Sequence, residues 1–227
     1  MRAYDTVLFD LDGTLLNTLD DLKDSVNFIL ERHGCPTWEE RELRSFLGNG
    51  LRRLMELSVP GGMEHPGFEE MFEEFRVYYT AHCEQKTRPY PGVEELLQQL
   101  KGHGLRMAVV SNKDHEAVEE LGRRFFPWLS VCMGQQEGLR RKPAPDMAEA
   151  AMKALGAAKD RTVYVGDSEV DFQTARNAGL PCILVSWGFR DRPELEALHP
   201  AALVDDPQSL FLELTRPCGS VEEKNKM

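Results

Sequence analysis

The sequence has few positive charges for its length. Its 227 residues include 27 Lys and Arg against 38 Asp and Glu, which gives a formal net charge of −11 with His neutral. A protein that binds nucleic acid along its surface needs clustered Lys and Arg, so this composition argues against a nucleic-acid partner. Any phosphate group that the protein binds must be held by a local arrangement of donors.

Long apolar runs and paired cysteines are absent as well. No apolar stretch approaches the roughly 18–20 residues that cross a bilayer, and the N-terminus leads into a strand-like segment without the apolar core of a signal peptide. We therefore predict a cytoplasmic protein with no membrane partner, with a soluble organelle as the alternative. The five cysteines show no Cys-x-x-Cys pair and no His spacing suited to zinc, so we expect reduced thiols.

The sequence does contain an alternation of short apolar runs and helix-like segments. The apolar runs are those expected of strands covered on both faces, and they are residues 6–11, 105–111, 162–165 and 182–185. The helix-like segments between them are residues 114–125, 146–155 and 169–178. This alternation predicts an α/β fold with a doubly wound, Rossmann-like parallel sheet, whose ligands bind beyond the carboxyl ends of the strands.

Residues 17–86 interrupt this alternation, because their pattern is helical throughout. We predict that they form a helical subdomain inserted after the first strand, and that residues 1–16 and 87–227 form the α/β core domain. Met and aromatic residues at three- and four-residue steps predict the core of the insert. Its 14 Asp and Glu against eight Lys and Arg fit a small substrate better than a long polyanion. The polar residues 219–227 are predicted to be a disordered tail.

Two carboxylates follow the first apolar run. Asp10 and Asp12 belong to the sequence Asp-Leu-Asp-Gly-Thr-Leu at residues 10–15. An Asp-Gly turn is common after a strand, but it does not explain a charge placed directly against an apolar run at Asp10. In extended chain the two side chains project to the same side. One can then attack phosphorus while the other handles the proton of the leaving group, and like charges this close also favour a bound cation.

Further polar residues follow the second run or precede a helix. Ser111, with Asn112 after it, ends a predicted strand, where its hydroxyl and nearby backbone N–H groups can hold phosphate oxygens; a helix N-cap is the alternative. Lys142 lies in a basic segment before a Pro. One ammonium group there can neutralise phosphoryl oxygens and the Asp10 carboxylate together, and a solvated basic run is the alternative.

Two more carboxylates follow the third run. Asp167 comes after a strand and a Gly, close to Asp10 if the two strands are neighbours, and it is a natural ligand for Mg²⁺, which prefers a few hard oxygen atoms. Asp171 lies one helical turn further along the same face, where it can bind the metal or orient a metal-bound water. The alternative for Asp171 is an acid at a helix start, favoured by the helix dipole. Both are candidate metal residues, and we rank Asp167 above Asp171 as a direct ligand.

These motifs, in this order, resemble those of the haloacid dehalogenase superfamily of phosphohydrolases, and they span the chain from Asp10 to Asp171. The resemblance implies a Mg²⁺-dependent phosphatase in which Asp10 forms an aspartyl-phosphate. Asp12 acts first as general acid and then as general base. The resemblance also implies that Mg²⁺ is held by the Asp10 and Asp167 carboxylates and by the backbone carbonyl of Asp12.

The same resemblance implies which residues hold the substrate. Ser111 and Lys142 bind the transferring phosphoryl group, and Gly13, Thr14 and Asn112 are expected to contact the substrate as well. Phosphoryl transfer depends mainly on positioning and charge neutralisation, which this set offers. We expect the partner to be a small phosphorylated metabolite and the protein to be a monomer or a homodimer.

An insert directly after the first motif is similar to the helical cap of the first type in this superfamily, which closes over the site and selects substrates. Residues 46–53 look like the loop that phosphoglycolate phosphatases of this superfamily place over the active site. Gly48 and Asn49 are expected to expose backbone N–H groups, and Arg52 or Arg53 to meet a substrate carboxylate. The alternative is an ordinary turn with surface arginines.

A phosphomonoester hydrolase acting on a phosphoglycolate-like metabolite is therefore the first hypothesis. A pyrophosphatase, a nucleotidase, a sugar phosphatase and a phosphomutase similar to β-phosphoglucomutase are the alternatives, because much the same motifs serve them. A non-catalytic regulatory or binding module is the alternative from another class. That module would show decayed catalytic positions, and none is decayed in this sequence.

Overall fold

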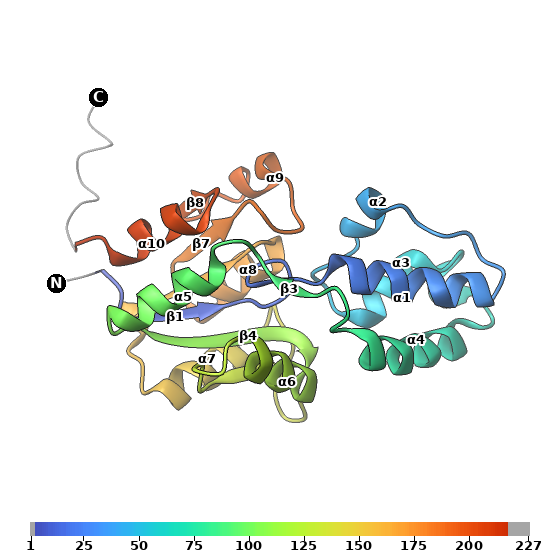
Figure 1. Cartoon of the computed structure of the whole chain (residues 1–227), viewed down its shortest axis with the longest axis horizontal. Coiled ribbons are helices and arrows are strands. Elements are labelled where there is room, and N and C mark those ends of the chain that lie inside the picture. Colours follow the sequence, from blue (N-terminus) through green and yellow to red (C-terminus); the bar gives the residue numbers. More distant parts are fainter. Residues whose placement is uncertain (1–2, 218–227) are drawn as a thin grey trace.

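A computed structural model describes residues 3–217 of the chain (Figure 1). It divides into a sheet covered by helices and a group of helices set to one side of that sheet. The tail predicted at residues 219–227 lies outside the described residues. No helix among residues 3–217 is long and apolar enough to cross a membrane.

Six parallel strands form one sheet in the order β5-β4-β1-β6-β7-β8. Along the chain they are β1 (Thr6–Phe9), β4 (Arg106–Asp114), β5 (Cys132–Gln135), β6 (Thr162–Gly166), β7 (Cys182–Val185) and β8 (Ala202–Val204). The predicted doubly wound α/β fold is confirmed. The edge strands β5 and β8 were not predicted, because they are short and only partly buried and so lack a continuous apolar run.

Helices cover both faces of the sheet. They are α5 (Val93–Gly102), α6 (His115–Phe125), α7 (Asp146–Leu155), α8 (Glu169–Ala178), α9 (Arg192–Glu196) and α10 (Pro207–Thr215), with the short 3₁₀ turn η2 (Lys159–Arg161) before β6. Successive side chains of a strand point to opposite faces. Accordingly Val7 and Phe9 pack with α5, α6 and α10, whereas Leu8 packs with α7 and α8. The central strand β1 is therefore buried on both sides, which is why its sequence is a continuous apolar run.

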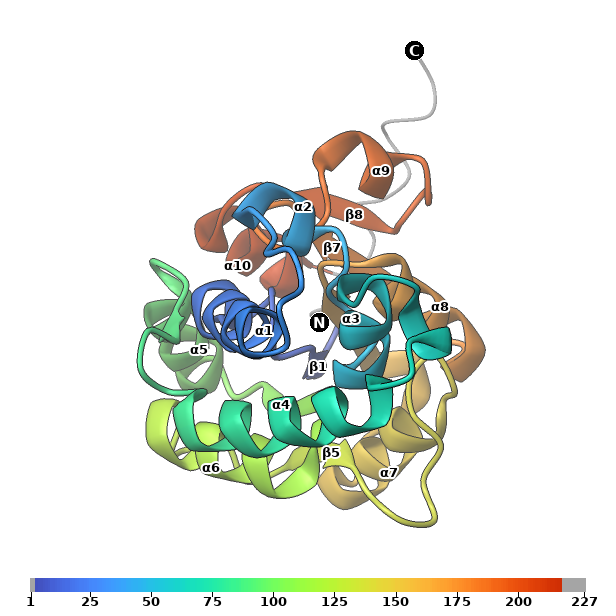
Figure 2. The same cartoon turned by 90° about the vertical axis from the view of Figure 1, so that its right-hand side faces the viewer.

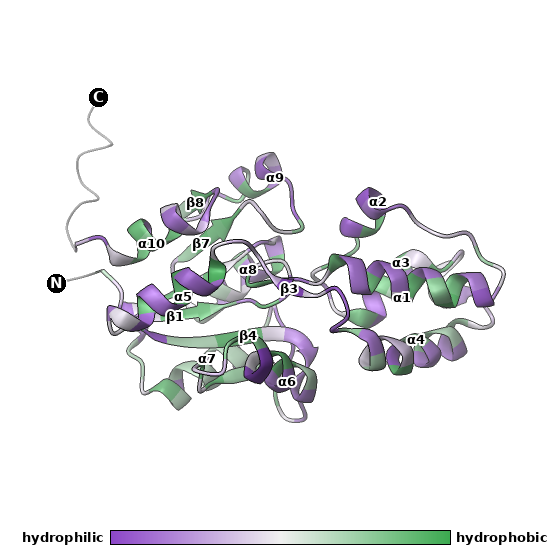
Figure 3. Ribbon diagram, in the orientation of Figure 1, coloured by the Kyte–Doolittle hydropathy of each residue, from purple (hydrophilic) through white to green (hydrophobic). Residues whose placement is uncertain are grey.

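The remaining helices form a second apolar core. They are α1 (Leu19–Arg32), α2 (Glu40–Arg44), α3 (Leu51–Ser58) and α4 (Phe68–His82), with the short 3₁₀ turn η1 (Gly62–Glu64) before α4. Val26 and Ile29 pack with Met71 and Phe75 in this core. Figure 2 views this group from its outer end, and Figure 3 shows hydrophilic and hydrophobic residues alternating along the helices while the strands are mainly hydrophobic. We call this group the cap; its limits at residues 17 and 86 stay a prediction.

Two connections join the cap to the sheet. They form the short antiparallel pair β2 (Leu16–Asn17) and β3 (Arg88–Pro89). Next to this pair the buried carboxylate of Asp21 accepts hydrogen bonds from the backbone N–H groups of Lys86, at 2.9 and 3.1 Å, and Thr87, at 2.8 Å. One carboxylate thus ties the first turn of α1 to the returning chain, and it fixes both connections relative to each other.

We predict that Asp21→Ala lowers the free energy of unfolding by about 2–4 kcal/mol, because the buried N–H of Thr87 and the partly buried N–H of Lys86 lose their acceptor. Urea denaturation followed by circular dichroism measures the change. The matched control is Asp24→Ala, which removes an exposed ion pair with the Lys86 side chain and should cost less than about 1 kcal/mol. Equal effects of the two substitutions would contradict the assigned role of Asp21.

Candidate active site

Polar residues from three neighbouring strands meet at one edge of the sheet. Asp10 follows β1, Ser111 lies in the last part of β4, and Asp167 follows β6. Because these strands are parallel and adjacent in the order β4-β1-β6, their carboxyl ends lie side by side. A cavity between this edge and the cap is lined by Asp10, Asp12, Leu22, Leu47, Gly48, Gly50, Leu51, Leu54, Ser111, Asn112, Lys113, Lys142 and Phe189.

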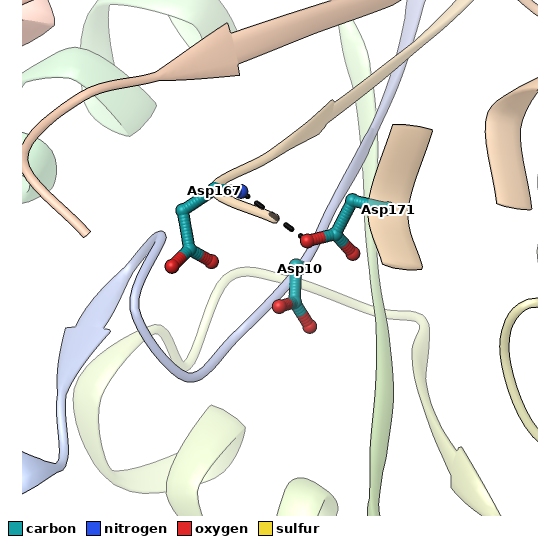
Figure 4. Close-up of side chains that lie close together, drawn as sticks. All are labelled: Asp10, Asp167 and Asp171. Carbon is teal, nitrogen blue, oxygen red and sulfur yellow. Dashed lines mark hydrogen bonds between the residues drawn. The ribbon is translucent and has the colours of Figure 1, made fainter. Parts of the chain in front are cut away.

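Three buried carboxylates converge beside this cavity. Asp10, Asp167 and Asp171 each place one oxygen within 4.8 Å of the others (Figure 4). Burial raises the pKa of Asp10 well above its usual range, helped by Asp171 and opposed by Lys142, and burial with the nearby Asp171 raises the pKa of Asp167 to about 7. The ionised form of these carboxyl groups is therefore costly in this buried setting unless a further cation neutralises it. Hard oxygen atoms with an excess of negative charge suit a divalent cation such as Mg²⁺.

Lys142 is the ammonium group inside this cluster. Its Nζ atom lies 2.7 Å from Oδ1 of Asp10 and 2.8 Å from Oδ1 of Asp171. Burial alone would lower the pKa of Lys142, but the two carboxylates outweigh it and raise that pKa, so the side chain stays charged. The side chain of Asn112 fixes the backbone of Lys142 by accepting its N–H at 2.7 Å and donating to its carbonyl at 3.1 Å. Asn112 lines the cavity, yet its amide group is used to place Lys142.

Asp167 and Asp171 differ in what surrounds their oxygens. Asp171 accepts hydrogen bonds from Lys142, from the Ser168 hydroxyl at 2.6 Å and from the backbone N–H of Asp167 at 3.2 Å. Asp167 accepts from the Thr14 hydroxyl at 3.1 Å and from the backbone N–H of Phe189 at 2.7 Å. Both oxygens of each carboxylate thus accept hydrogen bonds, and the ranking of Asp167 above Asp171 as a direct metal ligand stays a prediction.

Two glycines let their own backbone lie close to the Asp167 carboxylate. A Cβ atom on Gly13, whose φ is +88°, would lie 2.4 Å from Oδ2 of Asp167, and one on Gly188 would lie equally close to that atom. Gly13 and Thr14 both pack against Asp167 and neither lines the cavity, so their contact with the substrate stays a prediction. Gly188 was not found from the sequence, since an isolated Gly after a strand is typical of any turn.

Asp12 lies apart from the three-carboxylate cluster. Its Oδ1 atom is 3.1 Å from Nζ of Lys113, and its Oδ2 atom accepts a long hydrogen bond of 3.4 Å from the Ser111 hydroxyl. Nζ of Lys113 also donates to the hydroxyl of Tyr79, in the cap helix α4, at 2.5 Å. Burial alone would lower the pKa of Lys113, but Asp12 and Tyr79 raise it overall. Sequence reasoning missed both residues: Lys113 follows the Ser-Asn pair without a pattern of its own, and Tyr79 lies on an apolar helix face.

The cap loop is attached to the sheet through its backbone. Gly48 and Gly50 line the cavity, whereas the Asn49 carbonyl accepts a hydrogen bond from Arg141. Arg190, which follows β7 and is held by Glu169, donates to the Leu47 carbonyl at 2.8 Å. Cap residue Arg44 in turn donates to the Gly188 carbonyl at 2.7 Å. These contacts hold the cap over the cavity.

The two arginines predicted to meet a substrate carboxylate lie elsewhere. Arg52 makes two hydrogen bonds of 2.8 Å to Glu69 and lies over the ring of Phe72, on the outer surface of the cap. Arg53 pairs with Glu56 one turn along the same helix at 2.6 Å. Neither lines the cavity, so the structure supports the alternative of surface arginines. Helical spacing gives no information on which face of α3 meets the sheet.

The sequence of this chain is similar to those of known phosphatases. Residues 7–185 match the family model described as haloacid dehalogenase-like hydrolase. A phosphoglycolate phosphatase of Pseudomonas syringae pv. tomato is 32% identical over 215 residues, covering 90% of this chain and 78% of that protein. An N-acetylmuramic acid 6-phosphate phosphatase of Pseudomonas aeruginosa is 31% identical over 214 residues, covering 92% and 94%.

A solved structure shows the same architecture. The crystal structure of a phosphoglycolate phosphatase candidate from Lactobacillus delbrueckii subsp. bulgaricus superposes with a TM-score of 0.90 and 34% identity, over 95% of this chain and 99% of that one. The family match covers the segment that carries Asp10, Lys142 and Asp167, and these are the residues that the fold brings together. The chain belongs to the haloacid dehalogenase-like hydrolase family.

Proposed function

We propose that this protein is a Mg²⁺-dependent phosphatase that transfers the phosphoryl group of a small phosphorylated metabolite to Asp10 and then to water. The observation that carries the proposal is the contact of 2.7 Å between the Asp10 carboxylate and Lys142, beside two further buried carboxylates and at the edge of a cavity. A charged nucleophile, a fixed cation and a cation site in one small volume are what phosphoryl transfer requires.

Each polar group of the cavity has a distinct part in this reaction. Asp10 is the nucleophile, and Lys142 neutralises phosphoryl oxygens, helped by the hydroxyl of Ser111. The Asp10 and Asp167 carboxylates and the backbone carbonyl of Asp12 would hold Mg²⁺, which supplies charge neutralisation to the phosphoryl oxygens when bound. Asp12 gives a proton to the leaving oxygen and later takes one from water.

The cap side of the cavity bears on the kind of substrate. It presents the apolar residues Leu22, Leu47, Leu51 and Leu54, against which Phe189 of the sheet domain packs, while the cations that line the cavity, Lys113 and Lys142, both come from the sheet domain. A small leaving group fits this shape better than a polyanion. We propose a small phosphorylated acid such as phosphoglycolate, a choice supported by the names of the relatives from Pseudomonas, whose substrates are both phosphorylated acids.

The setting of the reaction follows the expectations from the sequence. We propose a cytoplasmic enzyme that works as a monomer or a homodimer, with no nucleic-acid or membrane partner. The net charge of −11 supports the exclusion of nucleic acid. A phosphomutase with the same functional residues would transfer the phosphoryl group back to an organic product. Release of inorganic phosphate therefore distinguishes a phosphatase from a mutase.

Asp10→Asn should lower the rate of phosphate release by more than about 10³-fold, because the amide is no nucleophile while its volume matches the carboxylate. A colorimetric assay of inorganic phosphate from 2-phosphoglycolate measures the rate, and thermal unfolding checks that the variant is folded. Turnover near the wild-type rate in a folded variant would exclude the aspartyl-phosphate mechanism.

The acidic cluster predicts a pH-dependent effect of Mg²⁺ on stability. Asp167 has a pKa of about 7 in the folded protein, above its usual value of 3.8, so its contribution to stability is complete below about pH 4 and is lost as the pH rises through about 7. Mg²⁺ competes with protons for these oxygens. At about ten times its Kd, it should raise Tm by about 3–6 °C at pH 8 and by less at pH 5.5.

Differential scanning fluorimetry with Mg²⁺ and with EDTA tests this effect at both pH values. Asp167→Ala should remove most of the Mg²⁺-dependent gain, whereas Asp160→Ala, at a surface position in η2, should keep it. An equal gain at pH 5.5 and pH 8, or an undiminished gain in Asp167→Ala, would place the cation elsewhere.

The positions of Arg52 and Arg53 predict that they do not select the substrate. The double variant Arg52→Ala/Arg53→Ala should change kcat/KM by less than about threefold for 2-phosphoglycolate and for p-nitrophenyl phosphate alike, since exposed ion pairs of the cap contribute about 1 kcal/mol or less. Steady-state kinetics with both substrates measure this. A loss of tenfold or more confined to 2-phosphoglycolate would restore the carboxylate-binding role predicted from the sequence.

A further inference from the structure

A chain of three polar side chains crosses from the cap to the sheet. Tyr79 belongs to the cap helix α4, Lys113 to β4, and Asp12 to the turn after β1. Nζ of Lys113 donates to the Tyr79 hydroxyl at 2.5 Å and to Oδ1 of Asp12 at 3.1 Å, and it lies 4.7 Å from the centre of the Tyr79 ring. Lys113 is 6% exposed and Tyr79 is 2% exposed.

Lys113 holds both oxygens of the Asp12 carboxylate, one directly and the other through the Ser111 hydroxyl. The ammonium group contacts Oδ1, while the backbone N–H of Lys113 donates to the Ser111 hydroxyl at 3.2 Å, and that hydroxyl donates to Oδ2 at 3.4 Å. A buried ammonium group is costly unless it is paired, so its burial needs both of its partners. One of these partners, Tyr79, is present only while the cap is seated on the sheet.

Other contacts hold the cap without touching Asp12. Arg190 donates to the Leu47 carbonyl, and Arg44 donates to the Gly188 carbonyl and pairs with Asp191. The Tyr79 hydroxyl is therefore not needed merely to attach the cap. The Tyr79–Lys113 contact differs from these cap contacts because Lys113 also contacts Asp12.

We propose that Lys113, while Tyr79 of the cap is seated on it, is a positioning residue that orients the Asp12 carboxyl group for proton transfer to the leaving group. This inference rests on the proposed phosphatase function. Cap closure is then coupled to the acid step, because Lys113 loses one of its two partners when the cap lifts and its hold on Asp12 relaxes. Asp12 is then positioned to protonate the leaving oxygen only when the cap encloses the substrate.

The two half-reactions balance with Lys113 keeping its proton throughout. In the first, an oxygen of Asp10 bonds to phosphorus, the bond from phosphorus to the leaving oxygen breaks, and Asp12 transfers its proton to that oxygen. In the second, water attacks phosphorus, Asp12 takes the water proton, and the bond between phosphorus and Asp10 breaks. The products are the free alcohol, inorganic phosphate and the regenerated Asp10 carboxylate.

A pair of substrates with different leaving groups tests this role. An alkyl phosphate such as 2-phosphoglycolate needs a proton on its leaving oxygen, whereas p-nitrophenolate leaves without one. Since kcat/KM covers the steps through departure of the leaving group, Lys113→Met should lower kcat/KM about 10²-fold for 2-phosphoglycolate and less than about threefold for p-nitrophenyl phosphate. Tyr79→Phe keeps the ring and should cause a smaller loss, about three- to tenfold, with the same selectivity.

The second half-reaction gives an independent signature. With p-nitrophenyl phosphate, Lys113→Met should release a rapid burst of p-nitrophenolate equal to the enzyme and then turn over slowly, because Asp12 must still take a proton from water. Lys113→Arg should restore part of the activity on 2-phosphoglycolate. A residue that acts only in folding would show neither the burst nor the rescue.

Arg44→Met is the matched control, because it removes a contact between cap and sheet that does not reach Asp12. Arg190 and Arg141 still hold the cap loop in this variant, so the cap stays seated with Tyr79 on Lys113, and kcat/KM should change by the same factor for both substrates. Equal losses on both substrates in Lys113→Met and Tyr79→Phe, or no loss in either, would overturn the inference while wild-type turnover leaves the phosphatase function in place. A wild-type protein that hydrolyses neither phosphate overturns the proposed function itself.

Discussion

The contact of Lys142 with Asp10 and Asp171 is the interaction on which the rest of the site depends. Three buried carboxylates within 4.8 Å of one another repel each other, and their burial is tolerable only with positive charge beside them. Lys142 supplies part of that charge and a divalent cation would supply more. The fold places these groups beyond the end of the sheet, where strand ends are adjacent and the interior meets the cap. An enzyme that handles phosphate needs the same balance of charge.

The cap completes this arrangement in two ways. It lines the cavity with apolar side chains and glycines. Its helix α4 also brings Tyr79 against Lys113, next to Asp12. The connection between cap and sheet is short and is tied by the Asp21 carboxylate. The roles proposed for the cap in substrate selection and proton transfer thus rest on a subdomain with its own apolar core.

Much of the core domain could be predicted from local patterns. A strand buried on both faces must be apolar throughout, so β1, β4, β6 and β7 stand out in the sequence, and charges directly after such runs need a functional reason. The short edge strands β5 and β8 carry no such pattern. The cap helices were visible from their spacing, but the direction of each face was not, which is why the sequence left open whether Arg52 or Arg53 meets the substrate or lies on the surface, where the structure pairs Arg52 with Glu69.

The sequence alone predicted that Asp10 and Asp167 would meet, because each follows a buried strand and parallel strands bring their carboxyl ends to one edge. Lys142 follows no such strand, and its place beside them was predicted from the order of the motifs. Only the tertiary structure decided the partners of Asp12. Tyr79 and Lys113 are 34 residues apart and belong to different subdomains, and their contact depends on how the cap is oriented on the sheet. Periodicity reports that a side chain is buried, whereas the packing of whole elements decides which group it meets.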